Sequence, residues 1–439
     1  MRFLGKLLCA LSVCCAALPL GAADPFTLTL DDAVARALDH SVSLETGRIT
    51  LEERDYAADR LWALVFPAIS ADAGIRYGST LFTGARQPVE QRFSYSTSVG
   101  LSLSFTAGLP YRMKLLGLAY DRQLLTYEDA QRLLEIATVK SFCDLVAERK
   151  NLDQLAETQD LAERQLERSR IGRDNGLIGQ TALSQSELAV EVANYELSVA
   201  QATYAANLGA FLSSLGLPPE PLAELEGEFE VRRLKLDAEE LIREYLDKRP
   251  DIVQQSRAIE EAKLASRQRS LDARSPSLRL SLNWGGGSGG GGITAPFADS
   301  LSGSVSLSIP VNSWIPGTTE SQALRTAKNE IEKAELNLTN IKNQAAAQIR
   351  MLVANLRNSW ESREIALRRE QIAQRSYDLT ERGVQNGAVE TFALETSRKS
   401  LTDAWYQVLR SGFSYQKLAL DLAQALNADW RNYITRSGP

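Results

Sequence analysis

The stretch FSYSTSVGLSLSF, residues 93–105, alternates apolar side chains with Ser, Thr or Gly. An alternation with a period of two is typical of a β-strand with two different faces. Three further stretches, at residues 69–77, 278–284 and 301–311, show the same period. A polar or glycine-rich loop joins the members of each pair, so we expect strand hairpins at residues 68–106 and 277–311.

The polar face of these strands favours a membrane environment over a soluble β-sandwich. A sandwich would carry charged residues outside, whereas this face is mostly Ser and Gly, and aromatic residues stand near the strand ends. Outer-membrane barrel strands place apolar side chains toward lipid and polar ones toward a water-filled lumen. The residues that we expect to face lipid are Ile75, Tyr77, Phe93, Tyr95, Leu101, Leu103, Leu280, Leu282, Trp284, Val305 and Leu307.

Four strands are too few to close a barrel. An open sheet edge in lipid would leave backbone groups without hydrogen-bond partners, at a cost of several kcal/mol each. Several copies of the chain must therefore share one barrel. Twelve strands from three chains or sixteen from four are the smallest plausible closures, and the trimer is the simpler arrangement.

Long helical segments follow the strands. Neither Tyr111–Asp174 nor Gly317–Gln385 contains a proline, and each is long enough for a helix of about 100 Å. Their apolar residues step by three and four, as in a coiled coil. Each segment ends at an Asn-Gly pair, and a second apolar-periodic run follows, which predicts two helical hairpins with tight turns at their tips.

The order of helix, two strands and long helical hairpin occurs twice, which indicates one duplicated unit. We expect a first repeat at residues 24–217 with its tip near 175–182, a connector at 218–240, a second repeat at 241–427 with its tip near 386–393, and a C-terminal tail at 428–439.

The N-terminus indicates export from the cytoplasm. Residues 1–23 read as a secretory signal peptide, because Arg2 and Lys6 precede an apolar run and the small residues before Asp24 suit cleavage. Processing before Cys14, which would leave an acylated cysteine, is the alternative. No later apolar stretch reaches the roughly 18 residues of a membrane-spanning helix.

Composition excludes several functional classes. Acidic residues number 55 against 49 basic ones, and no long basic run occurs, so the footprint of a nucleic-acid-binding protein is missing. His40 is the only histidine, and Cys143 is the only cysteine beyond the signal peptide. Disulfides, Cys/His metal sites and histidine-based catalysis are thereby excluded for the mature chain. We expect His40 at the surface, Cys143 buried in the helical seam, and neither an enzyme nor a cofactor.

Two pairs of sequences carry a resemblance to a known family. LTLDDAVARALDHS, residues 28–41, has a second copy in LIREYLDKRPDI, residues 241–252. The tip sequences NGLIGQTAL and NGAVETFAL begin at Asn175 and Asn386. Together with the duplicated order of elements, they resemble TolC-like outer-membrane efflux proteins over nearly the whole mature chain.

The resemblance implies a mainly α fold with a small β part. Each chain of a homotrimer would give four transmembrane strands to a shared 12-stranded barrel in the outer membrane of a diderm bacterium, and its coiled-coil helices would form a periplasmic α-barrel. The function implied is a passive exit duct of a tripartite efflux or type I secretion system, for small molecules or proteins. Implied partners are a periplasmic adaptor protein, an inner-membrane pump of the RND, ABC or MFS type, and outer-membrane lipid, without nucleic acid. An exported coiled-coil structural or adhesion protein without a pore is the alternative.

The helix tips are where this family closes its channel and meets its adaptor. The candidate tip residues are Asn175, Gly176, Gln180, Thr181, Ala182, Asn386, Gly387, Glu390, Ala393 and Glu395. Ala182 and Ala393 stand where the resemblance would place aspartates that line the constriction, which argues against an acidic ring there. Glu390 and Glu395 are the carboxylates that could replace it, and the simpler interpretation is that both are solvated surface residues.

Overall fold

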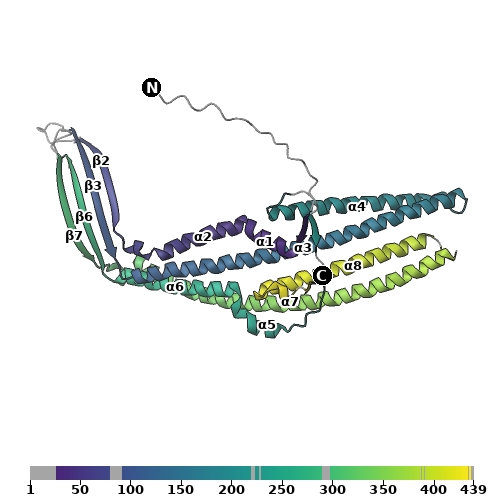
Figure 1. The fold of residues 1–439 in the computed structure, drawn as a ribbon. Helices are drawn as coiled ribbons and strands as arrows, with labels where there is room; N and C mark the ends of the chain where they lie inside the picture. Colours follow the sequence, from purple (N-terminus) through teal and green to yellow (C-terminus); the bar gives the residue numbers. More distant parts are fainter. Residues whose placement is uncertain are drawn as a thin grey trace, which may run out of the picture.

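A computed structural model describes residues 26–79, 91–218, 223–226, 229–288, 297–386, 388–389, 391–433 and 435–436. The predicted signal peptide, most of the two loops that join the strands, Gly387 and Glu390 lie outside the described residues. Figure 1 shows an elongated molecule with a β-sheet at one end and two helical hairpins that reach toward the other.

The four predicted strands form one antiparallel sheet. They are β2 (Ala68–Ser79), β3 (Gln91–Phe105), β6 (Ser277–Ser288) and β7 (Phe297–Ser308), paired in the order β2-β3-β6-β7. The two hairpins join through β3 and β6, where Leu101 lies opposite Leu282 and Ser102 opposite Ser281. This register keeps apolar residues on one face and small polar residues on the other across all four strands.

Long helices run from the sheet to the far end (Figure 1). Helix α3 (Leu109–Asp174) has 66 residues and α7 (Thr319–Gln385) has 67. Two shorter partners, α4 (Gln180–Ser214) and α8 (Thr391–Leu426), fold back against them. Helix α3 also packs against α8, so the helices lie in the order α4, α3, α8, α7.

Shorter elements fill the half of the molecule nearest the sheet. Helices α1 (Leu30–His40), α2 (Val42–Asp59) and α6 (Pro250–Arg274) pack on α3, and α5 (Ala238–Tyr245) packs on α7. Short 3₁₀ turns link helices to neighbouring elements, namely η1 (Leu61–Val65), η2 (Leu246–Lys248) and η3 (Asn312–Trp314).

A close backbone contact fixes the change of direction from sheet to helix. The backbone N–H of Gly108 donates to Asp272 Oδ1 at 3.0 Å, which ties the start of α3 to the end of α6. A Cβ at position 108 would lie 2.4 Å from the same oxygen, so any larger residue there would displace the Asp272 side chain from this contact. Pro110 follows in the first turn of α3, where its missing N–H costs nothing.

The buried core lies halfway along the helices. In one cluster, α1, α3, α4 and α8 pack around Phe142, whose ring stands 6.3 Å from that of Phe211. In the other, α7 and α8 meet around Ile349 and Tyr415. Cys143 is 1% exposed, as predicted for a small apolar residue, and His40 is exposed.

The two ends of the described chain both pair with the connector. Strand β1 (Phe26–Thr29) lies parallel to β4 (Ala223–Glu226), and β5 (Phe229–Glu230) pairs antiparallel with β8 (Thr435–Arg436). A last 3₁₀ turn, η4 (Trp430–Asn432), buries Trp430 in the first core cluster. The sequence predicts only a tail at residues 428–439, because elements as short as η4 and β8 (Thr435–Arg436) carry no readable period.

Candidate functional site at the helix tips

The first tip joins α3 to α4 through a turn that requires glycine. Asn175 ends α3, and Gly176 adopts a φ of 73° that side chains with a Cβ disfavour. The N–H of Leu177 then donates to the Gly172 carbonyl at 2.7 Å, so helix-end carbonyls gain partners as in a glycine-capped helix. The Asn-Gly pair thus ends the helix as the sequence predicts.

The second tip joins α7 to α8 in a similar way. The Asn386 N–H donates to the Arg382 carbonyl at 3.1 Å, and the Ala388 N–H donates to the Gly383 carbonyl at 2.8 Å. A Cβ on Gly383 would come within 2.6 Å of the Val389 side chain, so the turn packs directly on the helix backbone.

The two tips meet along a shallow cleft of about 210 Å³. Of the candidate residues, Ala182 and Glu395 line this cleft together. Ala393 is half-buried on α8 outside it. The other described candidates are exposed at the tips and do not line it, namely Asn175, Gly176, Gln180, Thr181 and Asn386. Gly387 and Glu390 lie outside the described residues.

A buried pair of serines joins the two arms of the first hairpin close to its tip. The hydroxyls of Ser169 on α3 and Ser186 on α4 lie 2.8 Å apart, and both residues are less than a tenth exposed. The Ser186 hydroxyl also lies 3.2 Å from the Ala182 carbonyl. These bonds satisfy both buried hydroxyls and hold the hairpin arms at one separation.

Near the tips, an arginine of the second hairpin contacts the first hairpin. Arg398 on α8 donates through Nη2 to the backbone carbonyl of Thr158 on α3, at 2.9 Å. Burial raises the pKa of the neighbouring Glu395 carboxyl, and the positive charge of Arg398 lowers it in part. Burial is also the main cause that raises the pKa of the Tyr377 hydroxyl close by.

Sequence reasoning missed Arg398 and Thr158. One signal was present, since Arg398 follows Glu395 by three residues and so lies on the same helix face. Its acceptor is a backbone carbonyl 240 residues earlier in the chain. A backbone carbonyl is present in every residue, so the residue type does not predict such a contact.

The apolar face of the sheet is exposed. Ile75 is 81% exposed, Val305 73% and Leu307 66%, values far outside those of a soluble core. Tyr77, Leu101, Leu282 and Trp284 are exposed as well, whereas Tyr95, Leu103 and Leu280 are half-buried by neighbours in the sheet. Phe93 is described by its backbone, which pairs with Tyr77. The predicted lipid-facing residues thus share one face by register.

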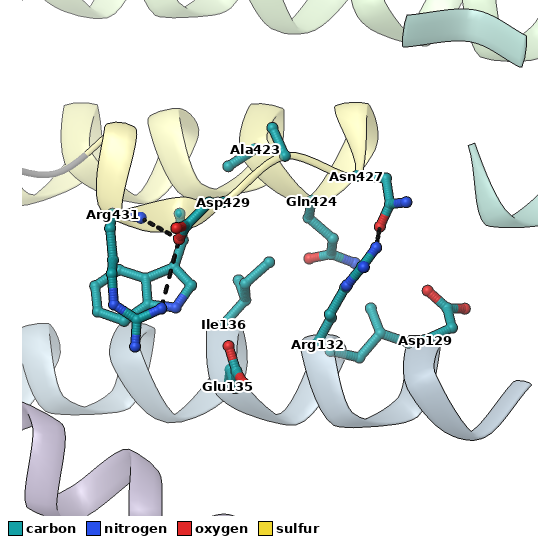
Figure 2. Close-up of a pocket in the computed structure, with 12 residues that line it drawn as sticks. Asp129, Arg132, Glu135, Ile136, Ala423, Gln424, Asn427, Asp429 and Arg431 are labelled. Carbon is teal, nitrogen blue, oxygen red and sulfur yellow. Dashed lines mark hydrogen bonds and ion pairs between the residues drawn. The ribbon is translucent and has the colours of Figure 1, made fainter. Parts of the chain in front are cut away.

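A second hollow, of about 220 Å³, lies where α3 passes the turn after α8 (Figure 2). Arg132 reaches from α3 to the Asn427 side chain, and Asp429 accepts from the backbone N–H of Arg431 at 3.0 Å. Burial raises the pKa of Asp129 at the edge of this hollow. The polar groups mainly pair with one another, so the hollow serves to join helix and turn.

Neither hollow suggests metal chemistry. Across the part of the chain that the structure describes, no three His, Cys, Asp or Glu residues are grouped to hold a metal ion. Among the described helices, none combines the length and the apolar content that a membrane crossing requires.

The comparisons with known proteins agree on the fold. CusC, solved in a study of folding and transmembrane channel formation, is similar with a TM-score of 0.73 and 16% identity, over 94% of this chain and 96% of that one. The Campylobacter jejuni CmeC outer membrane channel is similar with a TM-score of 0.72 and 17% identity, over 93% and 87%. The Neisseria gonorrhoeae MtrE outer membrane channel, in its open state, is similar with a TM-score of 0.71 and 17% identity, over 91% and 89%.

The sequence comparisons are more limited in extent. The comparison with curated proteins gives no match for this chain. Residues 241–428 match the family described as outer membrane efflux protein, which confirms the predicted resemblance over the second repeat. The chain thus carries the sequence signature of the outer membrane efflux proteins over its second repeat and the fold of the TolC-like channels over nearly its whole described length.

Proposed function

We propose that the chain is the exit channel of a tripartite efflux or type I secretion system, a passive duct rather than an enzyme. The observation that carries this proposal is the open sheet. Strands β2 and β7 each pair on one side only among the described residues, and the apolar face is exposed along the whole of β7. Such a sheet is unstable in water, and its unpaired edges are equally unstable in lipid.

Copies of the same chain remove both edges at once. If β2 of one chain pairs with β7 of the next, three chains give a closed sheet of twelve strands with an apolar exterior. Four chains would also close a sheet. The homotrimer is the simpler arrangement, and the two structural repeats at 24–217 and 241–427 would then supply equal parts of the wall.

The outer helices of the four-helix layer carry matching apolar stripes. On α4, exposed Leu188, Val192, Tyr195 and Val199 step by four, three and four residues. On α7, exposed Ile365, Ile372 and Leu379 step by seven. Both stripes lie within about six turns of their own tips, so α4 of one chain can pack on α7 of its neighbour at the same height. The helices would thereby continue the closed wall into the periplasm.

The tips are the proposed constriction and docking surface. The Arg398–Thr158 hydrogen bond holds the second hairpin against the first near the cleft that Ala182 and Glu395 line. Releasing it would loosen the hairpins near their tips, while the Lys140–Asp421 and Lys417–Asp144 ion pairs still join α3 to α8 farther from the tips. The exposed tip turns at Asn175 and Asn386 would meet the periplasmic adaptor, which in turn connects to an inner-membrane pump.

The test is the mass of the detergent-extracted protein, corrected for bound detergent, followed by conductance in planar bilayers. We expect three times the mass of the mature chain and a stable pore. Tyr195→Glu together with Ile372→Glu should reduce the trimer fraction, whereas Glu187→Gln, an exposed change on α4, should not. A monomer that is extracted without detergent and conducts nothing would support the alternative, an exported coiled-coil protein.

A second experiment tests the tip. Arg398→Ala should raise single-channel conductance or lower the voltage needed to open the pore, because the hairpin contact is lost. Arg375→Ala, which removes an exposed charge from α7, is the matched control. Equal conductance in both variants would remove the Arg398 contact from the proposed gate.

A further inference from the structure

Exposed aromatic residues gather where the sheet meets the helices. Trp62 in η1 and Phe66 just before β2 pack edge to face, with ring centroids 5.5 Å apart. They are 58% and 55% exposed, and Trp314 in η3, after β7, is 65% exposed. Large exposed aromatics outside a core mark a contact surface. Here they continue the exposed apolar face of the two edge strands.

Cationic side chains stand over aromatic rings in the same zone. Arg60 lies 3.4 Å from the centroid of the Tyr56 ring, and Arg274 lies 5.5 Å from that of Trp314. Lys114, in the first two turns of α3, lies 5.9 Å from the ring of Tyr111. We call these residues the junction belt, defined as Tyr56, Arg60, Trp62, Phe66, Tyr111, Lys114, Arg274 and Trp314. They come from four separate segments that meet at the base of the sheet (Figure 1).

The three cations have no acidic partner. Among the described residues, none of Arg60, Lys114 and Arg274 forms an ion pair with a carboxylate, and all three are exposed. The nearby Asp272 carboxylate is already engaged, since it accepts from the Gly108 N–H. Elsewhere on the helices exposed Arg and Lys commonly pair with Glu or Asp, as Arg350 does with Glu239. The charge of the belt is therefore left for a partner outside the chain.

We propose that the junction belt binds the anionic phospholipids of the membrane leaflet that faces the helices. This inference rests on the proposed function, which puts the sheet in the membrane. Amphipathic aromatic rings prefer the headgroup level, where basic side chains meet phosphates. Binding there would set the depth of the sheet in the bilayer. Trp62 and Trp314 flank opposite edge strands, so neighbouring copies would bring them together and make the belt continuous around the channel.

The test uses the full-length protein extracted in neutral detergent and stripped of lipid. Native mass spectrometry would follow the binding of phosphatidylglycerol and of phosphatidylcholine with the same acyl chains. We expect phosphatidylglycerol to bind more tightly, and Arg60→Gln, Lys114→Gln and Arg274→Gln combined to reduce that preference by about tenfold or more. The matched control replaces Arg232, Arg233 and Lys235 by Gln, which removes the same charge from exposed positions between β5 and α5, away from the sheet.

The outcomes separate the belt from the channel itself. An assembled pore with no preference for phosphatidylglycerol, or a control triple variant that loses as much preference as the belt variant, would overturn the inference and leave the proposed function intact. Displacement of phosphatidylglycerol by millimolar inorganic phosphate would also overturn it, because the site would then be a free phosphate site. The double variant Trp62→Ala and Trp314→Ala should bind less lipid while the mass of the assembled protein stays unchanged. Dissociation of this variant into monomers would overturn the inference, because the belt would then be a contact between copies of the chain. A protein that neither inserts nor assembles would refute the proposed function.

Discussion

The sheet and the middle of the helical region differ in the exposure of their apolar side chains. In the middle, Phe142 and Ile349 are fully buried and surrounded by side chains from three or more elements. In the sheet, Val305 and Leu307 are mostly exposed, although the register that aligns them is regular across four strands. One region has its apolar core within the single chain, and the other requires surroundings that a single chain does not supply. The helical region can thus fold in water, whereas the sheet needs an apolar environment around its exposed face. We call this the two-solvent interpretation.

The largest effect is expected from the helical core. Phe142→Ala should lower the free energy of unfolding by about 3–5 kcal/mol, because it leaves a cavity that packed neighbours cannot fill. Leu307→Ala is the matched control and should cost well under 1 kcal/mol in detergent by area burial, about a sixth of the core effect or less. Denaturation monitored by helical circular dichroism would measure both.

The adjacent Cys143 offers an independent measure of the same core. Burial raises the pKa of the Cys143 thiol to about 12, so the reactive thiolate is almost absent at neutral pH. We expect alkylation of the folded protein to be negligible and to follow unfolding in denaturant. Rapid labelling of the folded wild type would show that the middle of the molecule opens locally.

A charge on the apolar face of the sheet should have the next largest effect. Leu282→Arg places a charge on the face that we propose to meet lipid, and it should cost about 2–4 kcal/mol near the bilayer midplane. Ser281→Arg, one residue away, points to the opposite face and should cost much less. The fraction of protein that inserts into lipid vesicles is the measurement. Equal insertion of the two variants would contradict the two-solvent interpretation.

A smaller effect is expected inside the first hairpin. Ser169→Ala removes one partner of a buried hydroxyl pair and should cost about 0.5–1.5 kcal/mol. Ser184→Ala, at an exposed position on the same hairpin, should be neutral. Thermal unfolding midpoints of the two variants would test whether the tip is held by this contact or only by its turn.

The smallest effect concerns pH at the tip. Burial raises the folded-state pKa of Glu395 above its ordinary value of 4.5, so folding takes up a proton just above that pH. The contact between the hairpins should therefore become more stable as pH falls through the raised pKa, with the gain complete below 4.5. Glu395→Gln should remove this part of the pH dependence, and Glu361→Gln should retain it. Unfolding midpoints between neutral and acidic pH would be compared; a dependence that is unchanged in Glu395→Gln would argue against the buried carboxyl.

The sequence predicted the elements and their faces well, because each depends on a local period. Alternation of apolar and polar residues predicts the strands around Leu101 and Val305. The Asn-Gly pairs predict the helix ends at Asn175 and Asn386. Contacts between distant segments were not predicted. The pairing of β3 with β6, the Arg398–Thr158 bond and the burial of Trp430 each join segments that are individually unremarkable in composition.

The candidate site was predicted only in outline. Asn175 and Asn386 mark the turns, but among the candidates that the structure describes, only Ala182 and Glu395 share a cleft. Helical spacing tells which residues lie on one face of α4 or α8, and it leaves open how two hairpins rotate against each other. That rotation depends on packing along more than thirty residues of α8, where apolar residues occur on several sides.

The pairing of both chain ends with the connector has a practical consequence for engineering. Phe26 lies opposite Ala223 and Arg436 lies opposite Phe229, so both pair with the same short segment. We therefore expect a reporter placed directly after Arg436 to begin beside the connector. A linker between Arg436 and Phe26 would also allow the chain to be circularly permuted, with new termini at a strand loop and without breaking a helix.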